Sequence, residues 1–321
     1  MGNTKKHIQS ERPGSSIQCA FKVSIIGCGN VGATTAYALL LDGTPTDLAL
    51  IDLNKEKAEG ILLDLEHSLP FTSFTKLTAS DNYDECTGSS IVIITAGKRQ
   101  VEGQTRLQLL ADNKKIFRDM IPKIAAAAPN AILLVITNPV DVLTYEALKA
   151  SKFSSQKVFG TGTMLDTARL QFHLSEKLKI HPRSIDAYIL GEHGDSSFPV
   201  WSSANVMGKP ICGFTGFSQD TANQCYKDTR DAAYRIIHDV GFTCYSIATA
   251  TCELVKNIFA DTHQVFPLST LLQNYYGIND VCLSVPCVIG RNGIVQTLQI
   301  PLSDDEKKKL AASANLIKSL L

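Results

Sequence analysis

The sequence has no long hydrophobic run, no excess of charge of either sign and no cysteine pair at metal-site spacing. No segment reaches the 18 or more continuous apolar residues of a spanning helix, and residues 1–18 are too polar for a secretory signal. Lys plus Arg equals Asp plus Glu, at 31 each, so no large basic field is present to attract nucleic acid or an anionic membrane. These absences favour a cytoplasmic protein with small-molecule partners.

Cysteine is present nine times but never as C-x-x-C, and the residues are spread among apolar segments. This pattern is typical of buried reduced thiols rather than of a disulfide framework or a metal site. Aromatic residues are also few, at 7%, whereas 44% of the 321 residues are hydrophobic. A chain of this length and composition exceeds a typical single domain and should fold as two closely joined lobes.

Short β-branched runs alternate with helical stretches from residue 20 onward, which predicts parallel strands joined by helical crossovers. Helices are expected at 30–41 and at 114–128, the second ended by Pro129. We expect six strands in this half, at 21–26, 48–52, 76–79, 91–95, 132–137 and 158–160. The fold class is therefore α/β, a Rossmann-type doubly wound parallel sheet.

After residue 162 the regular alternation of predicted strands and helices ends. A helix is expected around 165–178, strands around 187 and 206, long helices across 218–260 and β-like runs near 281–300. A capping box at Ser303–Glu306 opens a terminal amphipathic helix. The expected organisation is an N-terminal arm (1–19), a dinucleotide-binding domain (20–162) and a mixed α+β substrate domain (163–321).

A glycine-rich turn, Gly27-Cys28-Gly29-Asn30-Val31-Gly32, stands between the first predicted strand and a helix. Such glycines permit a tight turn, a close approach of backbone to a pyrophosphate and close helix packing. Asp52 lies twenty residues beyond Gly32, at the end of the second strand, where it would accept hydrogen bonds from an adenine ribose. Because a carboxylate there repels a 2′-phosphate, the sequence favours NAD over NADP.

Three residues of the second half could move a proton and grip a carboxylate. Asp166 and Arg169 are three apart in a predicted helix and share a face, and His193 lies between two glycines after an apolar run. The arginine fork suits a substrate carboxylate, and a carboxylate beside the imidazole would raise its pKa and keep it a useful acid. On these residues alone, a surface ion pair and a structural histidine stay open as the alternative.

Four separated motifs resemble the L-lactate and malate dehydrogenase family over residues 20–320. They occur in the family's order and are Thr95-Ala96-Gly97 with the segment through Gln100 to Arg106, Thr137-Asn138-Pro139-Val140-Asp141, Leu165-Asp166-Thr167-Ala168-Arg169, and Gly191-Glu192-His193-Gly194-Asp195. The resemblance implies hydride transfer between NAD and C2 of a small 2-hydroxy or 2-oxo acid. It also implies a homotetramer.

The resemblance further assigns roles to single residues. His193 is the implied proton donor or acceptor, Asp166 its partner, and Arg169 the anchor of the substrate carboxylate. Arg106 is implied to polarise the substrate carbonyl from a closing loop that begins near Gly97, and Asn138 to hydrogen-bond in the site. Thr95, Ala96 and Gly97 are expected to line the cofactor, and no metal is expected.

The residue at position 100, here Gln100, is expected to distinguish lactate-type from malate-type members of the family. A malate enzyme resembling this chain would carry an arginine there for the second carboxylate, whereas this chain offers a neutral amide. Thr243 matches the threonine that narrows the pocket in lactate-type members. We therefore expect pyruvate and L-lactate as substrates; a malate dehydrogenase, a catalytically silent structural relative and a nucleotide-binding regulatory subunit stay open as alternatives.

Overall fold

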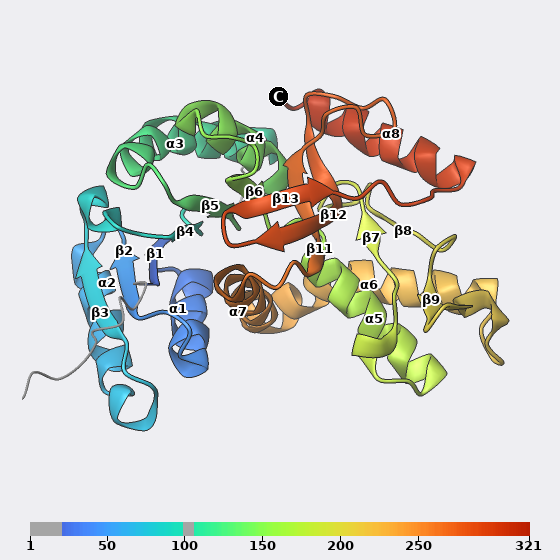
Figure 1. Cartoon of the computed structure of the whole chain (residues 1–321), viewed down its shortest axis with the longest axis horizontal. Coiled ribbons are helices and arrows are strands. Elements are labelled where there is room, and N and C mark those ends of the chain that lie inside the picture. The colour runs from blue at the N-terminus through green and yellow to red at the C-terminus, as the bar shows by residue number, and fades with distance from the viewer. Residues whose placement is uncertain (1–20, 99–105) are drawn as a thin grey trace, which may run out of the picture.

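A single sheet of nine strands forms the centre of the molecule, with helices on both of its faces (Figure 1). The structure is a computed structural model and describes residues 21–98 and 106–321, without the side chain of Arg106. The strand order is β13-β12-β11-β6-β5-β4-β1-β2-β3. The N-terminal arm and Gln100 lie outside the described residues.

Six parallel strands make up one end of the sheet, and all six predicted strands are present. Their order, β3-β2-β1-β4-β5-β6, is that of a doubly wound dinucleotide-binding sheet. β1 and β4 are buried almost throughout, as continuous apolar runs covered on both faces should be. The strands are β1 (Lys22–Ile26), β2 (Asp47–Ile51), β3 (Lys76–Ser80), β4 (Ile91–Ile94), β5 (Ile132–Val135) and β6 (Val158–Gly160). The α/β fold class is confirmed.

Helices cover this parallel part in two layers. In Figure 1, α3 (Arg106–Ala127) and α4 (Val140–Ser151) lie above the sheet, and α1 (Asn30–Asp42) lies below it, with α2 (Lys55–Glu66) beyond. The predicted start of α3 at Lys114 was wrong: the helix already includes Arg106. The earlier turns hold no glycine or proline and bury Leu110 and Asn113, so packing extends the helix toward its N-terminus.

The second half of the chain continues the same sheet. β11 (Val265–Leu271) pairs antiparallel with β6 through Ser269 and Gly160, and β12 (Cys282–Gly290) and β13 (Gly293–Thr297) follow. Hence one sheet runs through both predicted domains, and the boundary at residue 162 stays a prediction.

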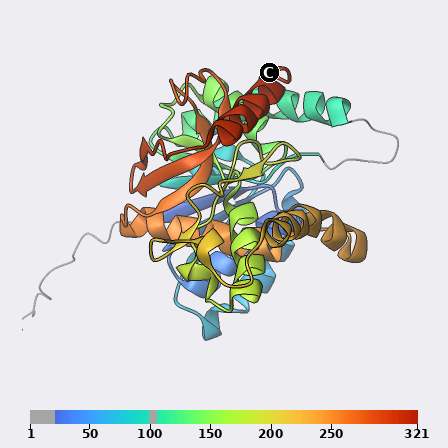
Figure 2. The ribbon, with the colours of Figure 1, turned by 90° about the vertical axis from the view of Figure 1, so that its right-hand side faces the viewer.

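The remaining elements pack around this extension. The helices are α5 (Met164–Leu178), α6 (Gln219–Val240), α7 (Tyr245–Ala260) and α8 (Asp304–Lys318), and Figure 2 shows α8 on the side of the sheet opposite to α5 and α7. The predicted capping box is confirmed, since the side chains of Ser303 and Glu306 each accept from the other's backbone N–H. Two-residue strands complete the fold: β7 (Ile189–Leu190), β8 (Phe198–Pro199), β9 (Asn205–Val206) and β10 (Lys209–Pro210).

The described residues include neither a membrane-spanning helix nor a cluster of metal ligands. No described helix has the length and apolarity to cross a bilayer. Nor do the described His, Cys, Asp and Glu side chains form a group of three or more that could hold a metal ion. Of the described cysteines, Cys212 is exposed, contrary to the expectation of burial, because it lies in a short surface turn; the others are buried and unpaired.

Candidate active site

The glycine-rich turn lies at the carboxyl end of β1, where the strand order reverses between β1 and β4. Gly27 has φ of +97°, and a Cβ there would stand 2.7 Å from the backbone of Ala96. A Cβ on Gly32 would lie 1.9 Å from the carbonyl oxygen of Gly27, so only glycine lets α1 start this close to the turn. Gly29 is the N-cap of α1 and supplies no side chain. The first N–H groups, from Asn30 and Val31 onward, are thus left for an anion such as a pyrophosphate.

Asp52 follows β2 and braces this turn. Its Oδ2 accepts a hydrogen bond from the backbone N–H of Cys28 at 2.7 Å, and its Oδ1 accepts from that of Asn54 at 2.9 Å. The side chain is partly exposed, and each oxygen keeps a further lone pair. The carboxylate therefore fits both its observed bracing contact and the predicted ribose contact.

The segment after β4 is fastened to two neighbouring strand ends. The Thr95 hydroxyl donates to the carbonyl oxygen of Gly27 at 2.7 Å, and the Thr137 hydroxyl donates to that of Ala96 at 2.8 Å. A Cβ on Gly97 would stand 2.5 Å from the methyl group of Thr137. Thr95, Ala96 and Gly97 are therefore held beside the glycine-rich turn, and their contact with the cofactor stays a prediction.

Asn113, which sequence reasoning missed, ties this segment to Asn138. Its Oδ1 accepts from the backbone N–H of Lys98 at 2.8 Å, and its Nδ2 donates to the carbonyl oxygen of Asn138 at 3.3 Å. Asn113 is 1% exposed, so its amide is a fixed spacer between two loops. The Asn138 side chain is exposed and makes no hydrogen bond to a described residue, so it can meet a ligand.

His193, Asp166 and Arg169 come together as predicted, although 27 residues separate the histidine from the aspartate. The Nδ1 of His193 lies 2.6 Å from Oδ2 of Asp166, and Nη1 of Arg169 lies 3.1 Å from Oδ1. Asp166 thus uses one carboxylate oxygen for the imidazole and the other for the guanidinium. The Nε2 of His193 and the other guanidinium N–H groups have no partner among the described residues and can face a substrate.

Asp141 is a second carboxylate behind His193. Its Oδ2 accepts the backbone N–H of His193 at 2.7 Å, and its Oδ1 accepts the hydroxyl of Ser269 on β11 at 2.6 Å. The residue is 1% exposed. Asp141 belongs to one of the four motifs, but no role was predicted for it from the sequence. Its place in the apolar run Val140-Asp141-Val142-Leu143 was the available signal of a buried site residue, because a buried charge needs partners.

These contacts set the protonation states of the site. Burial alone would lower the pKa of His193, but the adjacent Asp166, reinforced by Asp141, raises it to about 9. Burial would likewise raise the pKa of Asp166, yet the charges and hydrogen bonds of His193 and Arg169 hold it below its usual value. Near neutral pH the pair is therefore an imidazolium and a carboxylate, and Nε2 carries a proton that can be given away.

Three predicted site residues are not tested by this geometry. The backbone of Arg106 begins α3, but its side chain lies outside the described part of the chain, as does Gln100. Thr243 is half-buried in the loop before α7, without a described hydrogen bond to the histidine.

The glycine-rich turn at the end of β1 and the contacts of Asp166 with His193 and Arg169 are the features expected of the class of NAD-dependent hydroxy-acid dehydrogenases. Comparison with known proteins agrees: residues 21–160 match the family described as lactate/malate dehydrogenase, NAD binding domain, and residues 163–321 match its alpha/beta C-terminal domain. The chain belongs to the lactate/malate dehydrogenase family, and the resemblance found in its sequence is confirmed.

Individual relatives are similar over almost their whole length. The chain is 43% identical over 305 residues to proteins named L-lactate dehydrogenase from Clostridium botulinum and from Acetivibrio thermocellus, covering 94% of this chain and 96% of each relative. Among solved structures, a minor L-lactate dehydrogenase from Enterococcus mundtii superposes with a TM-score of 0.92 at 36% identity, covering 94% of this chain and 98% of that one. A lactate dehydrogenase from a deep-sea metagenome gives a TM-score of 0.91 at 39% identity, with the same coverage.

Proposed function

We propose that the chain is an NAD-dependent L-lactate dehydrogenase that interconverts pyruvate and L-lactate. The observation that carries this proposal is the contact of one carboxylate, Asp166, with both an acid–base imidazole and a guanidinium. The identity to relatives named L-lactate dehydrogenase supports it. We assign cofactor binding to residues 20–162 and substrate binding to residues 163–321.

The cofactor's nicotinamide supplies or accepts the hydride when it is bound. Arg169 holds the substrate carboxylate through the N–H groups that Asp166 does not use. His193 gives its Nε2 proton to the carbonyl oxygen of pyruvate, and Asp166 stabilises the imidazolium before that transfer. Together the hydride on C2 and the proton on oxygen convert pyruvate to L-lactate, and the neutral imidazole takes the proton back in the reverse direction.

The other predicted residues keep proposed roles. We assign Arg106 to stabilising the negative charge that develops on the carbonyl oxygen, and Asn138 and Thr243 to shaping the substrate pocket. The fit of the glycine-rich turn to a pyrophosphate, together with the carboxylate of Asp52, favours NAD over NADP.

The choice of pyruvate over oxaloacetate rests on Gln100. A second carboxylate opposite a neutral amide would be buried without a partner, which costs on the order of 3 kcal/mol, or about a hundredfold in kcat/KM. Initial rates with the two substrates and NADH test this. We expect faster pyruvate reduction in the wild type and a shift toward oxaloacetate in Gln100→Arg. Equal or faster oxaloacetate turnover by the wild type would favour a malate dehydrogenase.

The same assay separates an active dehydrogenase from a silent structural relative and from a regulatory subunit. A silent relative would leave NADH absorbance unchanged with every 2-oxo acid, and a regulatory subunit would bind NADH without responding to the pyruvate mimic oxamate. The intact arrangement of His193, Asp166 and Arg169 argues against both.

We further propose a cytoplasmic homotetramer. Large apolar side chains are exposed on the single chain around the end of α2 and on the C-terminal half of α6, including Leu63, Phe71, Phe74 and Tyr234. Exposed apolar patches of this kind mark association surfaces. Light scattering of the purified protein measures the assembly, and a monomeric mass would refute this part of the proposal.

A further inference from the structure

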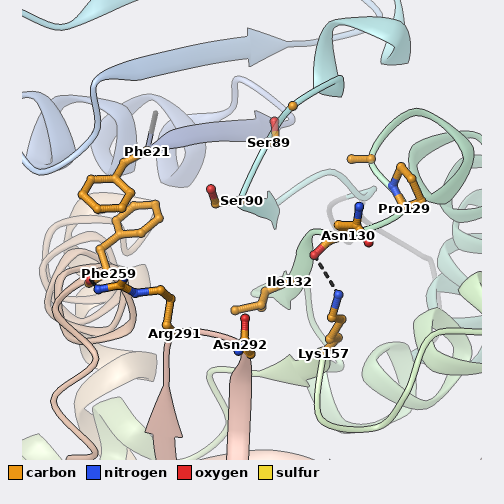
Figure 3. Close-up of a pocket in the computed structure, with 12 residues that line it drawn as sticks. Phe21, Ser89, Ser90, Pro129, Asn130, Ile132, Lys157, Phe259, Arg291 and Asn292 are labelled. Atoms are coloured by element: carbon orange, nitrogen blue, oxygen red, sulfur yellow. Dashed lines mark hydrogen bonds between the residues drawn. The ribbon is translucent and has the colours of Figure 1, made fainter. Parts of the chain in front are cut away.

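A cavity of about 430 Å³ lies at the edge of the sheet opposite to the candidate active site (Figure 3). Its wall uses the amino ends of parallel strands: Ser90 precedes β4, Ile132 begins β5 and Lys157 precedes β6. The glycine-rich turn and Asn138 follow the carboxyl ends of those same strands or their neighbours. The cavity is therefore separate from the cofactor and substrate site, and its volume falls within the range of small-molecule pockets.

Two cations line this cavity without a carboxylate partner among the described residues. The Nζ of Lys157 donates to the carbonyl oxygen of Asn130 at 2.9 Å, and Nη2 of Arg291 donates to that of Phe259 at 3.4 Å. No Asp or Glu is among the described lining residues. The nearby Asp261 uses its Oδ1 to accept the backbone N–H of Arg291 at 2.7 Å. The cavity is thus a positive site in a chain whose formal net charge is zero.

Neutral polar groups between the two cations are also unused. The side chains of Ser90, Asn130 and Asn292 make no hydrogen bond to a described residue. In Figure 3, Arg291 and Lys157 stand on opposite sides of the cavity, with Asn292 between them and Ser90 above. Their hydroxyl and amide groups add hydrogen-bond donors to those of the cations, a combination that suits the oxygens of an anion.

The wall near Arg291 is apolar. Phe21 and Phe259 stack with their ring centroids 4.5 Å apart, and Ile132 extends the apolar surface toward the centre of the cavity. A ligand held here by its charged end would place its other end against these rings.

We propose that this cavity binds a small anion with a flat apolar body, an aryl phosphate being the closest chemical description. The anionic group lies between Arg291 and Lys157, where it accepts from the cations and from the neutral donors. The apolar body packs on the Phe21–Phe259 pair. Binding here does not compete with the cofactor or the substrate, because the two sites occupy opposite edges of the sheet.

Calorimetric titration of phenyl phosphate into the full chain, with NADH and oxamate saturating the active site, tests the proposal. We expect one site per chain, and an affinity at least tenfold lower in Arg291→Gln and in Lys157→Gln, since each loses a charge-assisted hydrogen bond. Lys308→Gln, on the exposed face of α8, is the matched control and should bind as the wild type does. Inorganic phosphate and phenol, which carry one half of the ligand each, should bind more weakly.

Pyruvate reduction by both variants should equal that of the wild type, which shows that they are folded. No heat of binding in the wild type, equal affinity in all four proteins, or inorganic phosphate binding as tightly as phenyl phosphate would each overturn the proposal. These outcomes do not depend on turnover, so they leave the proposed dehydrogenase activity untouched.

Discussion

Asp166 contacts His193 and Arg169 through different oxygens. Its negative charge therefore raises the pKa of His193 and also keeps the Arg169 guanidinium in place. A histidine with this environment is an acid over most of the accessible pH range. Replacing the carboxylate by an amide keeps the shape and removes the charge, which isolates the electrostatic contribution.

Asp166→Asn should move the pH profile of pyruvate reduction. In the wild type, kcat/KM needs the protonated imidazole and should fall as pH rises through about 9, the raised pKa of His193. Without the carboxylate the falling limb should move to about pH 6.5 or lower, so that activity at about pH 8 drops at least tenfold. Asp186→Asn, an exposed acid, should leave the profile unchanged. An unshifted limb in Asp166→Asn would contradict the assigned pair.

His193→Gln should lower kcat for pyruvate reduction by roughly 10²- to 10⁴-fold, because an amide cannot give up a proton. NADH binding, followed by its fluorescence, should be unaffected, since the glycine-rich turn is intact. His181→Gln, in an exposed turn, is the control. Wild-type turnover in His193→Gln would remove the histidine from the mechanism.

We expect the buried carboxylate of Asp141 to lower the free energy of unfolding, although it holds the backbone of His193 in place. Burial raises its pKa to about 6 from 3.8, so the native state binds this proton more tightly than the unfolded chain does. Wild-type stability should therefore fall relative to Asp141→Asn as pH rises from about 4 to 6.5, by roughly 1–3 kcal/mol. Urea unfolding at several pH values measures this. If the difference in unfolding free energy between the wild type and Asp141→Asn did not change with pH, the claim that Asp141 is a buried charge would be contradicted.

At the scale of elements, the contact between α1 and the glycine-rich turn decides whether a dinucleotide can bind. Gly32→Ala would place a methyl group 1.9 Å from the carbonyl oxygen of Gly27, so α1 must move. We expect weaker NADH binding and a lower melting temperature. Gly60→Ala, on α2 with nothing within 4 Å of the new Cβ, should instead stabilise the protein by about 0.5–1 kcal/mol. Equal NADH affinity and equal melting temperature of Gly32→Ala and Gly60→Ala would contradict the claim that α1 needs a glycine at position 32.

Elements with a strong local signal could be predicted from the sequence. The six parallel strands, the glycine-rich turn and the Ser303–Glu306 capping box each depend on neighbouring residues. The early start of α3 was missed because it depends on the burial of Leu110 and Asn113 against other elements. The bracing contacts of Asp141 span 52 and 128 residues along the chain, and no local pattern encodes such partners.

At the scale of the whole molecule, the two matched family regions share one sheet and one large core. That core combines Val23 and Leu50 of the first half with Leu268 and Val285 of the second. The strand order and the addition of β11 to β6 could not be predicted, because pairing between distant strands depends on the packing of the whole chain.

This shared core predicts a single unfolding transition. Trp201, the one tryptophan, reports on the second half, whereas loss of NADH binding reports on the glycine-rich turn of the first. The midpoints of both signals in urea should coincide with that of far-ultraviolet circular dichroism. Separate midpoints would show that the halves unfold independently.

The pairing of Ser269 with Gly160 is the seam where the sheet changes from parallel to antiparallel, and Asp141 fastens His193 to that same Ser269. The backbone of His193 is thus tied, through Asp141, to the junction itself. A force or ligand that widened this junction would displace Asp141 and with it the backbone of His193, so the proposed acid–base chemistry and the integrity of the sheet would be lost together.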